Sequence, residues 1–125
     1  HHHVAPHGGT LVMLGDHAGH LEFVLDADAG TITMYALDGE AESAVRLNSI
    51  GVAVQITVPD KLAFNVQLRP VENVLTGETS TSTSQYVAQS DELKGVFSFK
   101  GVLSELAFRG SEMENVSFSY PEGSG

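Results

Sequence analysis

Residues 20–37, HLEFVLDADAGTITMYAL, decide the fold of this chain. In the first six residues the side chains alternate between the two faces of a strand. His20 and Glu22 therefore share one face with Val24, while leucine and phenylalanine side chains occupy the other. The turn that follows ends at Gly30, which can adopt a positive φ at little cost. Because the last seven residues alternate again, the stretch predicts a β-hairpin.

The rest of the chain repeats these signals, with short apolar runs recurring about every ten residues between turn-forming residues. The further runs are 10–14, 44–47, 51–58, 62–68, 86–88, 95–108 and 116–120. Gly101 is expected to kink or turn the chain inside the longest run, and Leu62 is expected to face the core. No stretch has the pattern of a long helix. We therefore predict an all-β fold, an antiparallel β-sandwich or partly open barrel of about eight to nine short strands.

The chain has 125 residues, enough for one domain with its own core. We expect residues 6–120 to form this single β-sandwich domain. Residues 1–5 are interpreted as an N-terminal tail or the remnant of an affinity tag, and residues 121–125 (PEGSG) as a disordered tail. The chain contains no cysteine, which excludes a disulfide, a thiolate nucleophile and a cysteine-ligated zinc site.

The net charge is −10, from 16 acidic and 6 basic residues. This charge argues against a nucleic-acid partner, whose phosphates require a basic face. It argues equally against binding to an anionic membrane surface. No apolar run approaches the roughly 20 residues of a membrane span, so we expect no membrane insertion. An acidic chain attracts cations, although the charge also serves solubility.

The histidines are crowded at one end of the chain, and imidazole is the commonest metal-binding side chain. His20 and Glu22 lie two apart on a predicted strand, with β-carbons about 7 Å apart, near enough for both to reach one ion. His7 would join them from the preceding glycine-rich loop, and His17 would complete a set of four. Imidazole with carboxylate suits Zn²⁺, Cu²⁺ or Ni²⁺, so the sequence predicts a site for one of these ions.

Three alternatives to this ligand set remain open. The histidines could form an exposed edge with no preferred ion. If His1 is the true N-terminus, its amine, two amide nitrogens and the His3 imidazole make a square-planar set for Cu²⁺ or Ni²⁺. Asp38 is another candidate carboxylate ligand, although a role in the turn Leu37-Asp38-Gly39 is favoured.

Catalytic chemistry has little support in the sequence. No serine lies in a G-x-S-x-G elbow, and there is no cysteine nucleophile. A zinc hydrolase would need three protein ligands, an open coordination position and a general base. The sequence offers no second domain that would form a cleft around such a centre. We therefore expect that the protein is not an enzyme.

A family resemblance adds to these observations. Residues 6–38 run P-H-G-G, L-V-x-L-G, H-L-E-F-V-L-D, a short turn and T-M-Y-A-L-D. This order resembles a PHGG-motif β-rich domain of bacterial envelope proteins and is similar to a segment of the periplasmic adaptor subunits of heavy-metal efflux systems. The resemblance implies an exported all-β domain, periplasmic or secreted, that handles transition-metal ions. It places His7, His20, Glu22 and Asp38 at motif positions, and it does not extend beyond residue 40.

These observations predict an exported, non-enzymatic domain that binds a divalent transition metal ion, as an accessory of metal homeostasis or efflux with an envelope protein as partner. The alternative is a structural or protein-interaction β-sandwich without a specific metal site, whose PHGG turn only shapes the sheet. Uncharged edge strands such as residues 96–99 could also pair two copies in a homodimer.

Overall fold

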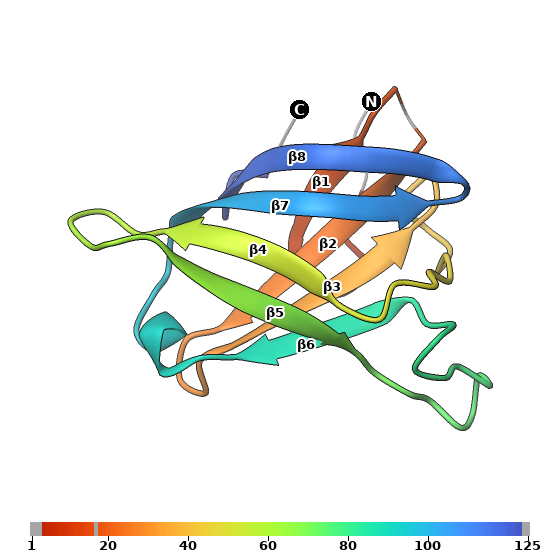
Figure 1. Cartoon of the computed structure of the whole chain (residues 1–125), viewed down its shortest axis with the longest axis horizontal. Helices are drawn as coiled ribbons and strands as arrows, with labels where there is room; N and C mark the ends of the chain where they lie inside the picture. Colours follow the sequence, from red (N-terminus) through yellow and green to blue (C-terminus); the bar gives the residue numbers. More distant parts are fainter. Residues whose placement is uncertain (1–3, 17, 124–125) are drawn as a thin grey trace.

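The chain folds into eight antiparallel strands that form one rolled sheet (Figure 1). This computed structural model describes residues 4–16 and 18–123. The elements are β1 (Thr10–Leu14), β2 (Gly19–Asp26), β3 (Thr31–Leu37), β4 (Val52–Thr57), β5 (Phe64–Pro70), β6 (Gln85–Gln89), the 3-10 helix η1 (Asp91–Leu93), β7 (Phe99–Phe108) and β8 (Ser111–Tyr120). Their order across the sheet is β1-β2-β3-β6-β5-β4-β7-β8. The predicted all-β antiparallel class is confirmed, in the form of a nearly closed barrel.

The predicted hairpin is formed by β2 and β3, which pair antiparallel with Glu22 opposite Tyr35. Leu21 and Phe23 are fully buried and belong to the hydrophobic core. Since side chains alternate along a strand, Glu22 points to the outer face of the sheet. The faces assigned from the alternation in residues 20–25 are therefore correct.

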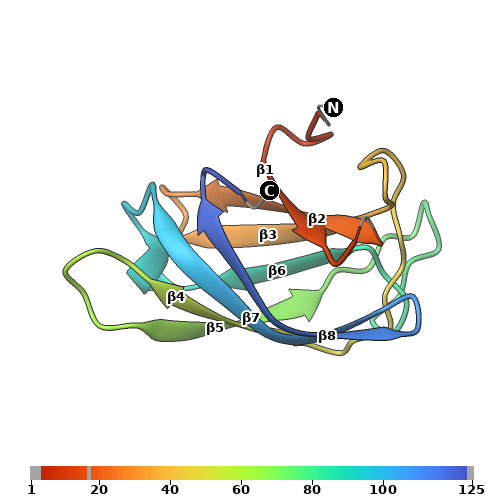
Figure 2. The same cartoon turned by 90° about the horizontal axis from the view of Figure 1, so that it is seen from above.

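Polar contacts join β1 and β2 to the end of β8 and the residue after it, where the barrel closes. Thr10 on β1 donates its hydroxyl to the carbonyl oxygen of Pro121 at 3.0 Å. The backbone N–H of Leu25 on β2 donates to the hydroxyl of Tyr120 on β8 at 3.3 Å. Residues 121–123, assigned from the sequence to a tail, therefore pack against the seam between β1 and β8, as the path of the chain end in Figure 2 shows.

Aromatic rings from opposite halves of the rolled sheet meet in the core. The ring of Phe23 on β2 stacks on that of Phe118 on β8 with centroids 4.3 Å apart. The ring of Phe99 on β7 meets Phe118 edge-on at 5.9 Å. Leu93 of η1 is also fully buried. Burying one such side chain stabilises the fold by about 1.5–3 kcal/mol, so these contacts help to hold the two halves together.

The expectation that Gly101 breaks the run 95–108 is wrong. β7 is continuous through Gly101, which pairs with Phe118 on β8. A β-carbon at this position would lie 2.6 Å from the Phe118 ring. The glycine is therefore needed because an aromatic ring packs flat against the strand.

Two further expectations are corrected by the structure. Residues 44–47 form no strand of their own and make only two isolated bridges, one from Ala44 to Leu37 and one from Leu47 to Thr83. Leu62 does not face the core: its side chain is 91% exposed. It lies in the turn between β4 and β5 because β5 begins only at Phe64.

Among the described residues there is no helix of the length and apolarity that a membrane span requires.

Candidate functional site

The candidate site lies on the outer face of β2 and β3, under the PHGG loop (residues 6–9). Glu22 points away from the core, yet it is fully buried, with 0% of its surface exposed. The PHGG loop covers it, because the backbone and side chain of His7 and the backbone of Gly9 all contact its carboxylate. A buried carboxylate is costly unless hydrogen bonds replace its lost water.

Three hydrogen bonds to the Glu22 carboxylate replace the water that it loses on burial. One carboxylate oxygen of Glu22, Oε2, accepts from the backbone N–H of His7 at 2.9 Å and of Gly9 at 2.8 Å. The other, Oε1, accepts from Nδ1 of the His7 ring at 2.7 Å. Hydrogen bonds to a charged acceptor are about twice as strong as neutral ones. The Glu22 carboxylate therefore holds the PHGG loop on the sheet.

The two glycines of the loop have different roles. Gly9 runs so close to β2 that a β-carbon would lie 2.4 Å from the carbonyl oxygen of Phe23 and 2.8 Å from a methyl group of Val24. Gly8 has open space around it but a φ of +72°, a conformation that favours glycine. Gly9 thus permits the close approach to β2, and Gly8 permits the turn that leads into it.

The His7 ring also stacks on Tyr35 of β3. The two ring centroids lie 3.6 Å apart, and the planes are inclined by 5°. Because Tyr35 is the cross-strand neighbour of Glu22, the stack holds the edge of the imidazole within hydrogen-bonding distance of the carboxylate. Burial, and secondarily the charge of Glu22, raise the pKa of Tyr35. The His7 side chain keeps 41% of its surface exposed.

His20 lies on the same outer face as Glu22, two residues earlier on β2, and only 4% of its surface is exposed. Its Nδ1 lies 3.1 Å from the backbone carbonyl oxygen of Asp38. The carboxylate of Asp38 is engaged elsewhere, since it accepts the backbone N–H groups of Glu42 at 3.0 Å and Glu40 at 3.2 Å. These turn hydrogen bonds, that of Glu42 foremost, lower the pKa of Asp38. Its side chain thus has the turn role that the sequence favoured.

The four predicted ligands are therefore only partly brought together. His7 and Glu22 are in contact, and His20 shares their face but is hydrogen-bonded to a different element. His17 lies outside the described residues. Within residues 4–16 and 18–123, no group of three or more His, Cys, Asp or Glu side chains is arranged to hold a metal ion. The metal site therefore stays a prediction.

Another hydrogen-bonded carboxylate, Glu78, was not predicted from the sequence. Glu78 lies in the loop between β5 and β6 and accepts from the hydroxyl of Ser84 at 2.6 Å, the backbone N–H of Ser84 at 2.7 Å and the hydroxyl of Thr76 at 2.6 Å. Desolvation raises its pKa, but these hydrogen bonds outweigh it and lower the pKa on balance. The sequence feature that could have predicted this cluster is the single carboxylate among the many hydroxyl side chains of residues 76–84.

Comparison with known proteins adds no relative. No family model matches the chain, and no curated protein and no solved structure shows significant similarity to it. The resemblance of residues 6–38 to envelope proteins therefore remains an expectation from the motif.

Proposed function

We propose that the protein is an exported, non-enzymatic domain that binds a divalent transition metal ion through histidine rings, one of which is oriented by Glu22. The supporting observation is that Nδ1 of both His7 and His20 lies within hydrogen-bonding distance of an oxygen acceptor of the protein. Carboxylate and carbonyl oxygens only accept, so Nδ1 carries the proton and Nε2 the lone pair of each neutral ring. Metal-binding histidines have this arrangement, with the second ring nitrogen bonded to a carboxylate or carbonyl.

The proposal changes the role of Glu22 within the predicted set. Its two oxygens already accept three hydrogen bonds, which leaves little capacity for direct coordination of an ion. We therefore assign the ligand role to His7, His20 and His17, and the orienting role to Glu22. Three imidazoles suit Zn²⁺, Cu²⁺ or Ni²⁺. The periplasmic or secreted location, and the link to metal homeostasis or efflux, follow from the PHGG resemblance alone.

Isothermal titration with ZnCl₂, CuCl₂ and NiCl₂ tests this proposal, on the full chain with His1, His2 and His3 replaced by alanine so that they capture no ion. We expect micromolar or tighter binding of at least one ion. His7→Phe keeps an aromatic ring on Tyr35 but removes the ligand nitrogens.

His7→Phe should weaken binding about tenfold or more, and Glu22→Gln, which disturbs the orienting acceptor, should weaken it by about tenfold. Glu78→Gln, a carboxylate with a comparable hydrogen-bond set at another loop, is the matched control and should leave binding unchanged. Absent or millimolar binding, or equal binding by the parent chain and His7→Phe, would contradict the proposal.

The second candidate is a structural or interaction domain without a specific metal site. One observation favours it: loop docking alone explains His7, Gly8, Gly9 and Glu22, because each contributes a contact or a backbone conformation that holds the PHGG loop. Under this alternative His7→Phe alters stability but no affinity for an ion. The same titration therefore separates the two candidates.

A further inference from the structure

β5 and β6 are paired over only a small part of their lengths. Arg69 pairs with Val87 and Pro70 with Tyr86, and no further residue pairs join these two strands within the described chain. From there the strands diverge toward η1, as Figure 1 shows at the left of the barrel. The sheet therefore has a wedge-shaped opening between the first part of β5 and the end of β6.

Backbone groups line this opening without strand partners. Residues 64–68 of β5 pair with β4 on their other side. In an antiparallel sheet a central strand directs alternate N–H and C=O groups to each neighbour, so part of this segment points toward β6. No residue of β6 pairs with residues 64–68 in the part of the chain that the structure describes. Such unpaired edges are templates for another extended chain.

The outer side of the opening is a groove of about 630 Å³. Its lining is partly polar and partly apolar and carries one charge: it includes Asn65, Gln67 and Arg69 of β5 and Val87 and Gln89 of β6. None of these residues is acidic. Among the described residues, Arg69 makes no ion pair. The groove thus presents one cation without a counter-charge in a protein of net charge −10.

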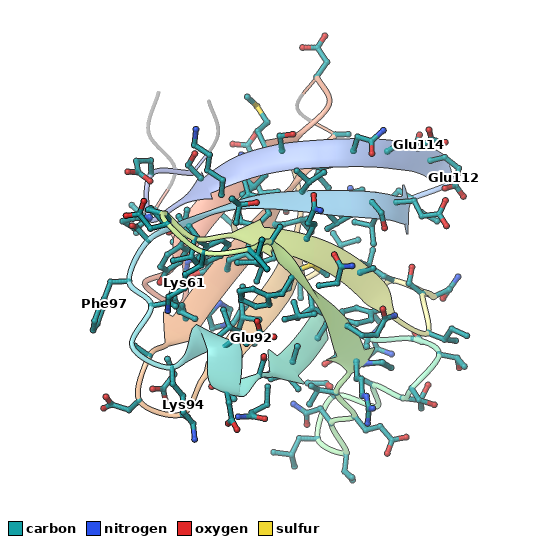
Figure 3. All side chains as sticks on the ribbon, turned by 60° about the vertical axis from the view of Figure 1, so that its left-hand side comes forward. Lys61, Glu92, Lys94, Phe97, Glu112 and Glu114 are labelled. Carbon is teal, nitrogen blue, oxygen red and sulfur yellow. The ribbon has the colours of Figure 1, made fainter. Side chains whose placement is uncertain are left out.

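Acidic residues flank both ends of the groove: Glu72 follows Arg69 by three residues at the narrow end, and Asp91 and Glu92 lie on η1 at the wide end. Glu92 is labelled there in Figure 3, and Asp91 pairs with Lys94 at 3.2 Å. Glu112 and Glu114 lie far from η1 in the same view, where β8 begins. The acidic residues thus lie outside the groove, and Arg69 is the one charged residue of its described lining.

We propose that this groove binds an extended peptide segment of a partner, which adds as a strand to the open edge of β5 or β6 and places a carboxylate on Arg69. The five residues 64–68 offer about 16 Å of edge at about 3.3 Å per residue, enough for a peptide of about five residues. Strand addition obtains affinity from main-chain hydrogen bonds and selectivity from side chains, here from the arginine. The carboxylate is either an acidic side chain or a C-terminus.

An array of random peptides of about eight residues, each made with an amidated and with a free C-terminus, provides the probes. Binders are then added to the ¹⁵N-labelled full chain, and amide hydrogen exchange is measured by NMR. We expect slower exchange, by about tenfold or more, at amides within residues 64–68 and 88–89, because new main-chain hydrogen bonds protect them. The two peptide series show which kind of carboxylate is bound.

Arg69→Glu should weaken binding of the carboxylate peptides by about tenfold or more, the effect of losing one charge-assisted contact. Arg109→Glu makes the same charge change in the β7–β8 turn, outside the groove, and should change affinity by less than about twofold. The proposal is overturned if no peptide on the array binds, if protection appears elsewhere, or if Arg69→Glu binds equally well. It is also overturned if these amides become protected with rising protein concentration alone, because the occupant is then a second copy.

Discussion

Glu22 and Glu78 each accept three hydrogen bonds from loop residues, but they differ in which groups donate and in how far the donors lie along the chain. Glu22 is fully buried and is bonded by groups 13 and 15 residues away, one of them an imidazole. Glu78 is partly exposed and is bonded by hydroxyls and one N–H within 6 residues. Glu22 therefore joins distant parts of the fold, whereas Glu78 orders a single loop.

The comparison bears on whether a histidine beside a carboxylate acts as a hydrogen-bond donor or as a metal ligand. The His7 ring donates to Glu22 as the Ser84 hydroxyl donates to Glu78, so the imidazole serves first as a hydrogen-bond donor. Any metal-binding role would use the other ring nitrogen and would come in addition. Substitutions at the two carboxylates and in the PHGG loop separate these roles.

Removal of each carboxylate measures how much its hydrogen bonds contribute to the free energy of unfolding. Glu22→Ala removes a fully buried carboxylate, takes the acceptor from two part-buried backbone N–H groups and opens a cavity, and it should lower the free energy of unfolding by about 4 kcal/mol. Glu78→Ala should cost about 1–2 kcal/mol, because water can reach its donors. Urea denaturation checks both values. Equal losses would show that burial and loop distance do not matter here.

The glycines of the PHGG loop distinguish a close approach from a backbone conformation. Gly9→Ala forces its β-carbon against the carbonyl oxygen of Phe23, lifts the loop from Glu22 and should cost about 3 kcal/mol. Gly8→Ala places an alanine at positive φ in open space and should cost about 1–2 kcal/mol. Thermal unfolding of the two variants tests the order, and the reverse order would rule out the close contact with β2.

The His7 ring makes both a hydrogen bond and a stack, and two variants separate them. His7→Ala loses both and should destabilise the fold by about 2 kcal/mol. His7→Phe keeps a ring over Tyr35 and should recover about 1 kcal/mol of that loss. If the two variants unfold at the same urea concentration, the stack on Tyr35 contributes nothing to stability.

The pH dependence of stability gives the smallest effect. The pKa of Glu78 in the folded protein is lowered from the ordinary value of 4.5. Its stabilising contribution is therefore fully present above pH 4.5 and is lost as the pH falls through the lower folded value. Glu78→Gln cannot titrate, so the stability gap between it and the parent chain should narrow, by less than about 1 kcal/mol, between about pH 6 and about pH 3. A gap independent of pH would contradict this assignment.

The alternation of side chains made the fold class, the β2–β3 hairpin and the faces of its strands predictable. A period of two residues survives in any antiparallel sheet, because one face must be buried. Gly101 was misread because a glycine inside an apolar run marks either a turn or a ring packed on a strand, and the ring belongs to β8. Leu62 was misread because an apolar residue at a turn continues the alternation without being buried.

The candidate site was predictable in part. The sequence predicted that His7 and Glu22 lie in the same site, and in the structure the two side chains are in contact. The roles of donor and acceptor were beyond the sequence, because they depend on the path of the PHGG loop and on two backbone N–H groups that carry no sequence signal. Glu78 was missed for a related reason: its donors are ordinary hydroxyls and a backbone N–H of a surface loop.

The central claim is that the Glu22 carboxylate holds the PHGG loop on the sheet whether or not an ion is bound. The most direct test is the free energy of unfolding of Glu22→Gln relative to the parent chain, measured with excess chelator and again with added ZnCl₂. We predict a loss of about 2–3 kcal/mol in chelator, because the amide group of glutamine turns a donor toward the N–H donors of the PHGG loop, and a similar or larger loss with zinc. Superimposable unfolding curves in chelator that separate only when zinc is added would contradict the claim.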